Sequence, residues 1–299
     1  MLIEKLLNDK YITLETTPPK LPTIDFMIEK IEKSDALKYI DGFSTTDCPL
    51  SKLKYNSIIA AFKLQEKFKK PVIATMSMRD RNKIALQSDL LGANDLNVTN
   101  ILALTGDPAK MSDQPNTKAV VEGSSLLLLD IIRAFNNGMD YAGKEFRLKP
   151  KPITPFVVSN SYAKNFASIE KKVHKKVTKY AKGIITQPVY DIDIVDKLLE
   201  IKNNIKEDFN DDRKNFEIVL GFFPITKLKT AQFLHSHVPG IYVPDSWIEK
   251  LIKAHKIGEN EEYKIGLELS RNLFQNLLKT HPKIHIMTAN RFEIVKELF

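Results

Sequence analysis

Short apolar runs alternate along the chain with longer segments in which apolar residues recur every three or four positions. The short runs are typical of buried strands, and the longer spacing is typical of amphipathic helices. Eight strands are predicted, at residues 11–14, 39–43, 71–75, 101–104, 155–158, 183–186, 217–222 and 284–287. Helices are predicted between them, at residues 23–34, 50–68, 82–94, 124–137, 165–180, 192–205, 227–235 and 261–279.

The regular order of strand and then helix predicts a parallel sheet of the α/β class. Eight such units predict a closed (β/α)8 barrel, a TIM barrel, in which residues 1–299 form a single catalytic domain. The competing fold is an open doubly wound sheet, which also alternates strands and helices. It is disfavoured because neither a Gly-x-Gly-x-x-Gly motif nor a Walker-type loop follows any predicted strand.

Composition favours an ordinary globular enzyme, with 43% hydrophobic and 27% charged residues in a chain of 299. The longest strongly apolar stretch, residues 126–132, contains Asp130 and is too short to span a membrane, and the N-terminus lacks the features of a secretory signal. The single cysteine, Cys48, excludes an internal disulfide and a cysteine-based zinc site. We therefore expect a cytoplasmic protein with no membrane partner.

Charge and histidine content add little to this picture. The net charge is +8, and lysines crowd residues 171–182, which could attract phosphates or nucleic acid. Apolar residues at helical spacing among these lysines indicate a solvated helix surface, so no nucleic-acid partner is expected. His235 and His237 lack a third ligand at useful spacing, so no metal site is expected. The other histidines, including His285, are interpreted as surface or packing residues.

Polar residues gather just beyond the C-terminal ends of the predicted strands. They include Glu15, Thr46, Thr75, Thr105, Asp107, Gln187 and Arg291. Each residue alone could serve a turn or a helix cap. Because the C-terminal ends of all barrel strands meet at one face, where TIM-barrel enzymes carry their active sites, the group as a whole predicts a catalytic site there.

Six segments, in order along the chain, resemble the methylenetetrahydrofolate reductase family. They are LETTPPK, RDRNKIALQSDLLGA, NILALTGDP, IITQPVYD, FLHSHVPGIYVP and IHIMTANR. The resemblance implies a catalytic barrel without a regulatory domain, which binds FAD noncovalently and reduces 5,10-methylenetetrahydrofolate to 5-methyltetrahydrofolate in one-carbon and methionine metabolism. It also implies NADH or NADPH as the electron donor and a homo-oligomeric assembly.

The resemblance assigns roles to individual residues. Glu15 matches the general acid that assists protonation of folate N10 as the ring opens to an iminium cation, and Asp107 matches the catalytic carboxylate that stabilises this cation. The implied substrate contacts are Glu15, Asp107, Gln187, Leu228 and Arg291. The implied cofactor contacts are Thr46, Thr75, Leu104, Thr105, Gly106, Asp107, Ser124, Asn160 and Lys176.

Three positions depart from the family pattern. Thr75 stands where many members have histidine, Asn160 where some have an aromatic residue, and Leu228 where some stack phenylalanine on folate or nicotinamide. The electron donor, which could be NADH, NADPH or a protein, is therefore left open, as is the size of the oligomer. Two other functions stay open: a flavin-carrying barrel subunit of a larger redox complex, and a TIM-barrel lyase or aldolase. The second would need a Schiff-base lysine, which the strand ends do not supply.

Overall fold

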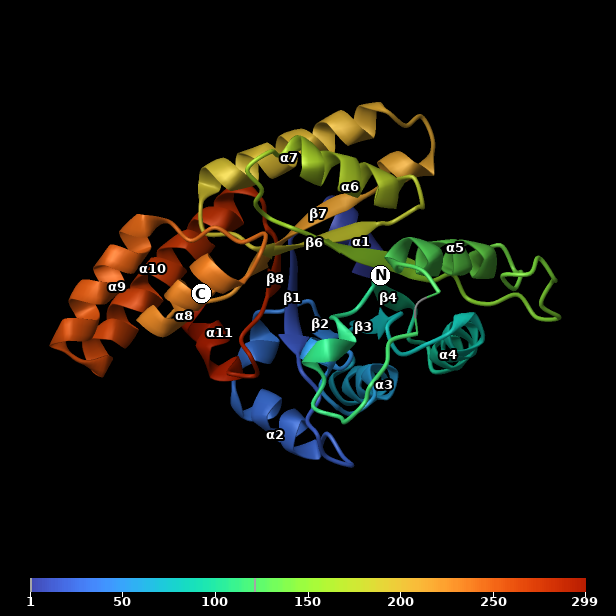
Figure 1. Ribbon diagram of the computed structural model, residues 1–299, viewed down its shortest axis with the longest axis horizontal. Helices are drawn as coiled ribbons and strands as arrows, with labels where there is room; N and C mark the ends of the chain where they lie inside the picture. The colour runs from blue at the N-terminus through green and yellow to red at the C-terminus, as the bar shows by residue number, and fades with distance from the viewer. Residues whose placement is uncertain (1, 121) are drawn as a thin grey trace.

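The strands of the computed structural model, which describes residues 2–120 and 122–299, close into one parallel barrel (Figure 1). They are β1 (Tyr11–Thr16), β2 (Gly42–Thr45), β3 (Val72–Ser77), β4 (Asn100–Leu104), β5 (Thr154–Ser159), β6 (Gly183–Pro188), β7 (Glu217–Phe222) and β8 (Lys283–Ile286). Each strand pairs with the next along the chain, and β8 pairs with β1, for example Thr13 with His285. The predicted (β/α)8 barrel is confirmed.

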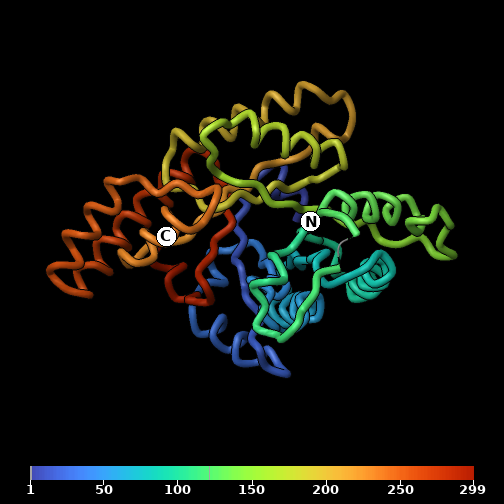
Figure 2. The backbone as a smooth tube through the Cα atoms, in the orientation of Figure 1, coloured from blue at the N-terminus to red at the C-terminus, as the bar shows by residue number. Residues whose placement is uncertain are grey.

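Helices surround this barrel, as the tube in Figure 2 also shows. They are α1 (Leu2–Asn8), α2 (Asp25–Lys33), α3 (Ser57–Phe68), α4 (Lys83–Asp95), α5 (Ser125–Asn136), α6 (Ala167–Val177), α7 (Ile192–Glu207), α8 (Leu228–His237), α9 (Asp245–Ile257), α10 (Glu259–Thr280) and α11 (Val295–Leu298). Their apolar stripes pack on the outer face of the strands and form the main core. No helix within the described residues is long and apolar enough to cross a membrane.

The inside of the barrel is apolar at its N-terminal end. Inward-facing residues of six strands, Tyr11, Ile73, Leu102, Phe156, Ile185 and Val219, form a separate buried cluster with Leu2 and Leu6 of α1. The Nζ atom of Lys283 donates hydrogen bonds to the carbonyls of Leu6, at 2.6 Å, and Asp9, at 2.9 Å, which anchors this helix. Helix α1 therefore closes the N-terminal end of the barrel.

Several predicted boundaries differ from the observed ones, and at the start of an element two differ by three residues or more. The strand predicted at 39–43 begins only at Gly42, because residues Ala36–Lys38 form a 3₁₀ turn that ends at Tyr39. The helix predicted from residue 50 begins at Ser57, where the side chain of Asn56 accepts a hydrogen bond from the amide of Ile59. Helices α1, α9 and α11 were not predicted, because the repeating order of strand and helix has one helix for each strand.

The long connection between β4 and α5 lies across the β2–α3 side of the barrel (Figure 2). Three contacts fix it there. The amide of Leu50 donates to Oδ2 of Asp107 at 2.6 Å, Lys20 pairs with Asp113 at 3.3 Å, and the amide of Val120 donates to the carbonyl of Arg79 at 2.7 Å. This connection is therefore a structured rim at the C-terminal end of the barrel.

Candidate active site

A cavity of about 450 Å³ opens at the C-terminal end of the barrel. Nine of the residues singled out in the sequence line it: Glu15, Thr46, Thr75, Leu104, Thr105, Gly106, Asp107, Lys176 and Gln187. They come from β1 to β4, from β6, and from α6. Segments far apart in the sequence thus bring carboxylates, hydroxyls, an amide and an amine to one cavity.

Four other predicted residues lie outside the lining of this cavity. Ser124 is the N-cap of α5 and accepts from the amide of Leu126 at 3.3 Å, while its neighbour Ser125 lines the cavity. The others face the β5, β7 and β8 side of the rim. Asn160 packs against Gly240, Leu228 begins α8, and Nη1 of Arg291 donates to Oγ1 of Thr226 at 3.2 Å.

Glu15 has a histidine beside it. The side chain of Glu15 is 27% exposed, and its Oε2 lies 3.8 Å from Nε2 of His285. The imidazole is buried, with Nδ1 at 2.8 Å from Oγ1 of Thr13 and Nε2 at 3.4 Å from Oγ of Ser44. The separation of the carboxylate and the imidazole is longer than a hydrogen bond, so a proton would pass between them only through a bridging water.

The position of His285 was not predicted, although the alternation of residues along β8 indicated it. In β8 this residue alternates with Ile284 and Ile286, so it points to the opposite face of the strand. The register pairs it with Thr13, two residues before Glu15, on the adjacent strand. Side chains two residues apart share a face, so His285 and Glu15 had to face the same interior.

Gly106 and Asp107 form the rim of the cavity at the end of β4. Gly106 has a φ of 93°, and a Cβ atom there would lie 2.2 Å from Oγ of Ser77. The carboxylate of Asp107 accepts a hydrogen bond from the amide of Leu50, whose φ is 56°. Left-handed backbone at a residue other than glycine is costly and concentrates at functional sites. The Asp107 carboxylate is thus held by a strained segment of the β2–α3 connection.

Two arginines stabilise the β2–α3 connection through hydrogen bonds and an ion pair. Nη1 of Arg79 donates to Oγ of Ser51 at 3.0 Å and to the carbonyl of Cys48 at 3.3 Å. Nη1 of Arg81 pairs with Oδ2 of Asp47 at 2.6 Å, and both of these side chains are buried. The arginines of the RDRN segment therefore support the loops that form the cavity wall.

Two polar groups of the cavity, the Lys176 amine and the Thr46 hydroxyl, have hydrogen-bonding capacity that the described residues do not fill. The Nζ atom of Lys176 donates to the carbonyl of Val158, and burial, with a smaller contribution from Lys172, lowers the pKa of this amine. The hydroxyl of Thr46 is buried without a hydrogen-bond partner among the described residues. A buried hydroxyl in that state costs free energy, which a ligand with a matching polar atom would recover.

Comparison with known proteins gives one family by sequence and one similar fold by structure. The sequence profile of methylenetetrahydrofolate reductase matches residues 2–299. No curated protein sequence matches the chain. One similar solved structure is an uncharacterized protein from Clostridium thermocellum that binds two copies of 5-methyl-5,6,7,8-tetrahydrofolic acid. Its TM-score is 0.58 at 14% identity, over 99% of this chain and 97% of that one, which shows a shared fold.

Proposed function

Since the chain belongs to the methylenetetrahydrofolate reductase family, we propose that it reduces 5,10-methylenetetrahydrofolate to 5-methyltetrahydrofolate, with FAD as cofactor and NADH or NADPH as electron donor. The observation that carries the proposal is that Glu15, Asp107, Gln187 and Lys176, to which the resemblance gives roles, line one cavity. The similar fold that binds a methylated tetrahydrofolate also supports a folate substrate. We place this activity in one-carbon and methionine metabolism of the cytoplasm, in a homo-oligomer of single-domain chains.

The residues of the cavity fit FAD by their chemistry. Lys176 offers a cation for phosphate, the unpartnered hydroxyl of Thr46 offers a hydrogen bond, and Gly106 lets the main chain come close to a flat ring. Thr105 and Leu104 would complete this wall. FAD, when bound, supplies the hydride that the reaction consumes.

The protein's own part in the reaction is to open the folate ring and stabilise the product of that opening. Glu15, next to His285, would give a proton to folate N10 and would then take one from solvent, to which its side chain is 27% exposed. The carboxylate of Asp107 would lie against the cation that forms as the C–N bond breaks. The hydrogen bond from Leu50 fixes the orientation of that carboxylate before the substrate arrives.

The position of the Lys176 amine favours the alternative hypothesis of a lyase. The amine of Lys176 reaches the cavity from α6, and its lowered pKa suits Schiff-base chemistry. In the sequence, the resemblance gave Lys176 as a cofactor contact, and the strand ends supplied no lysine for a Schiff base. Family membership favours the reductase over the lyase.

An anaerobic half-reaction tests the proposal. We expect the purified protein to contain FAD, and we expect its chemically reduced flavin to be reoxidised by methylenetetrahydrofolate in stopped-flow absorbance. A flavin that stays reduced at saturating folate would contradict the reductase and support the flavin-carrying subunit. A colourless protein that borohydride links covalently to a carbonyl substrate at Lys176 would establish the lyase instead.

Substitution Thr46→Val is expected to separate cofactor binding from stability. Removing an unpartnered buried hydroxyl should raise the free energy of unfolding of the FAD-free protein by about 1 kcal/mol, and the lost contact should weaken FAD binding about tenfold. Urea unfolding and fluorescence titration with FAD measure the two effects.

The neighbouring Thr16→Val is the matched control for this test. Oγ1 of Thr16 donates to the carbonyl of Ser44 at 2.7 Å, so its loss should cost about 1 kcal/mol and leave FAD affinity unchanged. Equal FAD affinities in the Thr46→Val variant and the unsubstituted protein would remove Thr46 from the cofactor site.

A further inference from the structure

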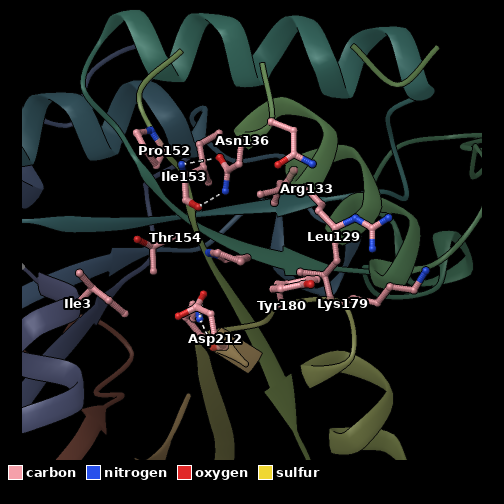
Figure 3. A pocket seen from close by; sticks show the side chains of 14 residues that line it. Ile3, Leu129, Arg133, Asn136, Pro152, Ile153, Thr154, Lys179, Tyr180 and Asp212 are labelled. Carbon is pink, nitrogen blue, oxygen red and sulfur yellow. Dashed lines mark hydrogen bonds and ion pairs between the residues drawn. The ribbon is translucent and has the colours of Figure 1, made fainter. Parts of the chain in front are cut away.

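Among the described residues, three asparagines each hold the main chain of a distant residue through two reciprocal hydrogen bonds. The side-chain amide accepts from the backbone N–H of that residue and donates to its carbonyl. Asn94 holds Lys151 in this way, and Asn136 holds Ile153, in the segment that leads into β5. Figure 3 shows the second pair, beside a second cavity of about 700 Å³. Both pairs lie at the N-terminal end of the barrel, away from Glu15.

The third pair lies at the C-terminal end of the barrel, next to the candidate active site. Oδ1 of Asn290 accepts a hydrogen bond from the amide of Thr17 at 2.9 Å, and its Nδ2 donates to the carbonyl of Thr17 at 2.7 Å. Asn290 lies in the segment after β8, and Thr17 directly follows β1, two residues after Glu15. The pair therefore ties the end of the strand that carries the predicted general acid to the segment after β8.

The ladder that joins β1 to β8 ends before Glu15. The register of β1 with β8 stops at Leu14, whereas its register with β2 continues to Thr16. The residue after Thr17 is Pro18, which has no N–H to donate. On the β8 side, Glu15 is therefore bracketed by the last ladder residue, Leu14, and by the asparagine pair at Thr17.

The turn that carries Asn290 is itself held in place. Ala289 and Asn290 both have left-handed backbone, with φ of 51° and 62°, a conformation that asparagine adopts more readily than most residues. On the other side of the turn, Nη1 of Arg291 donates to Oγ1 of the buried Thr226 at 3.2 Å, beyond the end of β7. The turn is thus attached to the segments that follow both neighbouring strands, β1 and β7, so it can support Asn290 rigidly.

We propose that Asn290 is a positioning residue for Glu15, which holds Thr17 and so keeps the Glu15 carboxylate where it can give a proton to folate N10. The inference rests on the proposed reductase function, and Asn290 acts only through Glu15. Its two hydrogen bonds exist before any substrate binds, so the acid is placed in advance. Misplacement of a reacting group by about 1 Å can lower a rate by about a hundredfold.

The half-reactions of the Asn290→Gly variant test this role. Glycine removes both hydrogen bonds and adopts the left-handed backbone without strain. We expect reoxidation of the reduced flavin by methylenetetrahydrofolate to slow about tenfold or more, with unchanged FAD affinity and unchanged reduction by NADH or NADPH. In the Glu15→Gln background the same substitution should slow reoxidation by less than about twofold, because the group that Asn290 positions can no longer donate its proton.

Asn136→Ala is the matched control for lost stability. It removes the same kind of hydrogen-bond pair at the other end of the barrel (Figure 3). It should lower the unfolding temperature to a similar degree and leave the folate half-reaction unchanged. Three results would overturn the proposal: equal slowing in the two variants, slowing of both half-reactions in Asn290→Gly, or the full additional loss in the Glu15→Gln background.

Hydrogen exchange followed by NMR decides the positioning role without any reductase activity. The amide of Thr17 loses its own acceptor in Asn290→Gly, so the diagnostic amides are those of Glu15 and Thr16, which we expect to exchange about tenfold faster. Unchanged exchange at both amides overturns the proposal, whatever reaction the protein catalyses. Faster exchange in a protein whose reduced flavin does not react with folate contradicts the reductase assignment and leaves the support of Glu15 by Asn290 established.

Discussion

Replacing Glu15 with glutamine should lower the rate of folate reduction by about a hundredfold or more, without changing FAD content. Glutamine keeps the size of the side chain but cannot donate a carboxylic proton, and general acid catalysis is worth about a factor of 10² to 10⁴. The loss should fall on the half-reaction with folate, because opening of the ring to the iminium cation needs that proton. Reduction of the cofactor by NADH or NADPH does not need it and should proceed normally.

Stopped-flow measurement of the two half-reactions checks this expectation. The matched control is Glu249→Gln, which makes the same change at an exposed position on α9 away from both cavities. Normal folate reduction in the Glu15→Gln variant would remove the general-acid role. Slowing of both half-reactions would instead indicate a structural role for the pair formed with His285.

Replacing Gly106 with alanine should destabilise the protein by about 2 to 4 kcal/mol and lower its FAD content. The added Cβ would lie 2.2 Å from Oγ of Ser77 and 2.8 Å from Cβ of Arg79. The serine hydroxyl could rotate away, but the arginine Cβ is fixed by the main chain. A φ of 93° adds strain for any residue with a side chain.

Gly92→Ala is the matched control and should have the opposite sign. Gly92 lies within α4, and a Cβ atom there meets nothing within 4 Å. Alanine should therefore raise the free energy of unfolding by about 0.5 to 1 kcal/mol through its higher helix propensity. Urea unfolding of both variants gives the comparison, and equal stability of the two would show that the main chain around Gly106 adapts freely.

The sequence predicted the barrel because each strand and helix carries its own periodic signal. Helix α1 escaped prediction because it precedes the first strand, outside the repeating order, and its role depends on Leu2 and Leu6 meeting residues from six strands. Such a contact arises only when the barrel closes, and no local pattern encodes it.

The candidate site was predicted in part, for a similar reason. Residues at the C-terminal ends of strands, such as Glu15 within β1 and Asp107 after β4, share a rim by topology, so the sequence order sufficed to group them. The left-handed backbone at Cys48, Leu50 and Ser51 left no mark in the sequence, since none of these residues is a glycine. It follows from long-range hydrogen bonds that exist only in the fold.

Closure of the N-terminal end of the barrel by α1 has a consequence for how ligands enter and leave the cavity. Because the N-terminal end is closed, a molecule that reaches Glu15 must enter and leave at the C-terminal end of the barrel. Under the proposed function, the folate and the nicotinamide would then occupy the cavity one after the other. The rate of ligand exchange would be set by the segments around Leu50 and Asp107, which frame the entrance of the cavity.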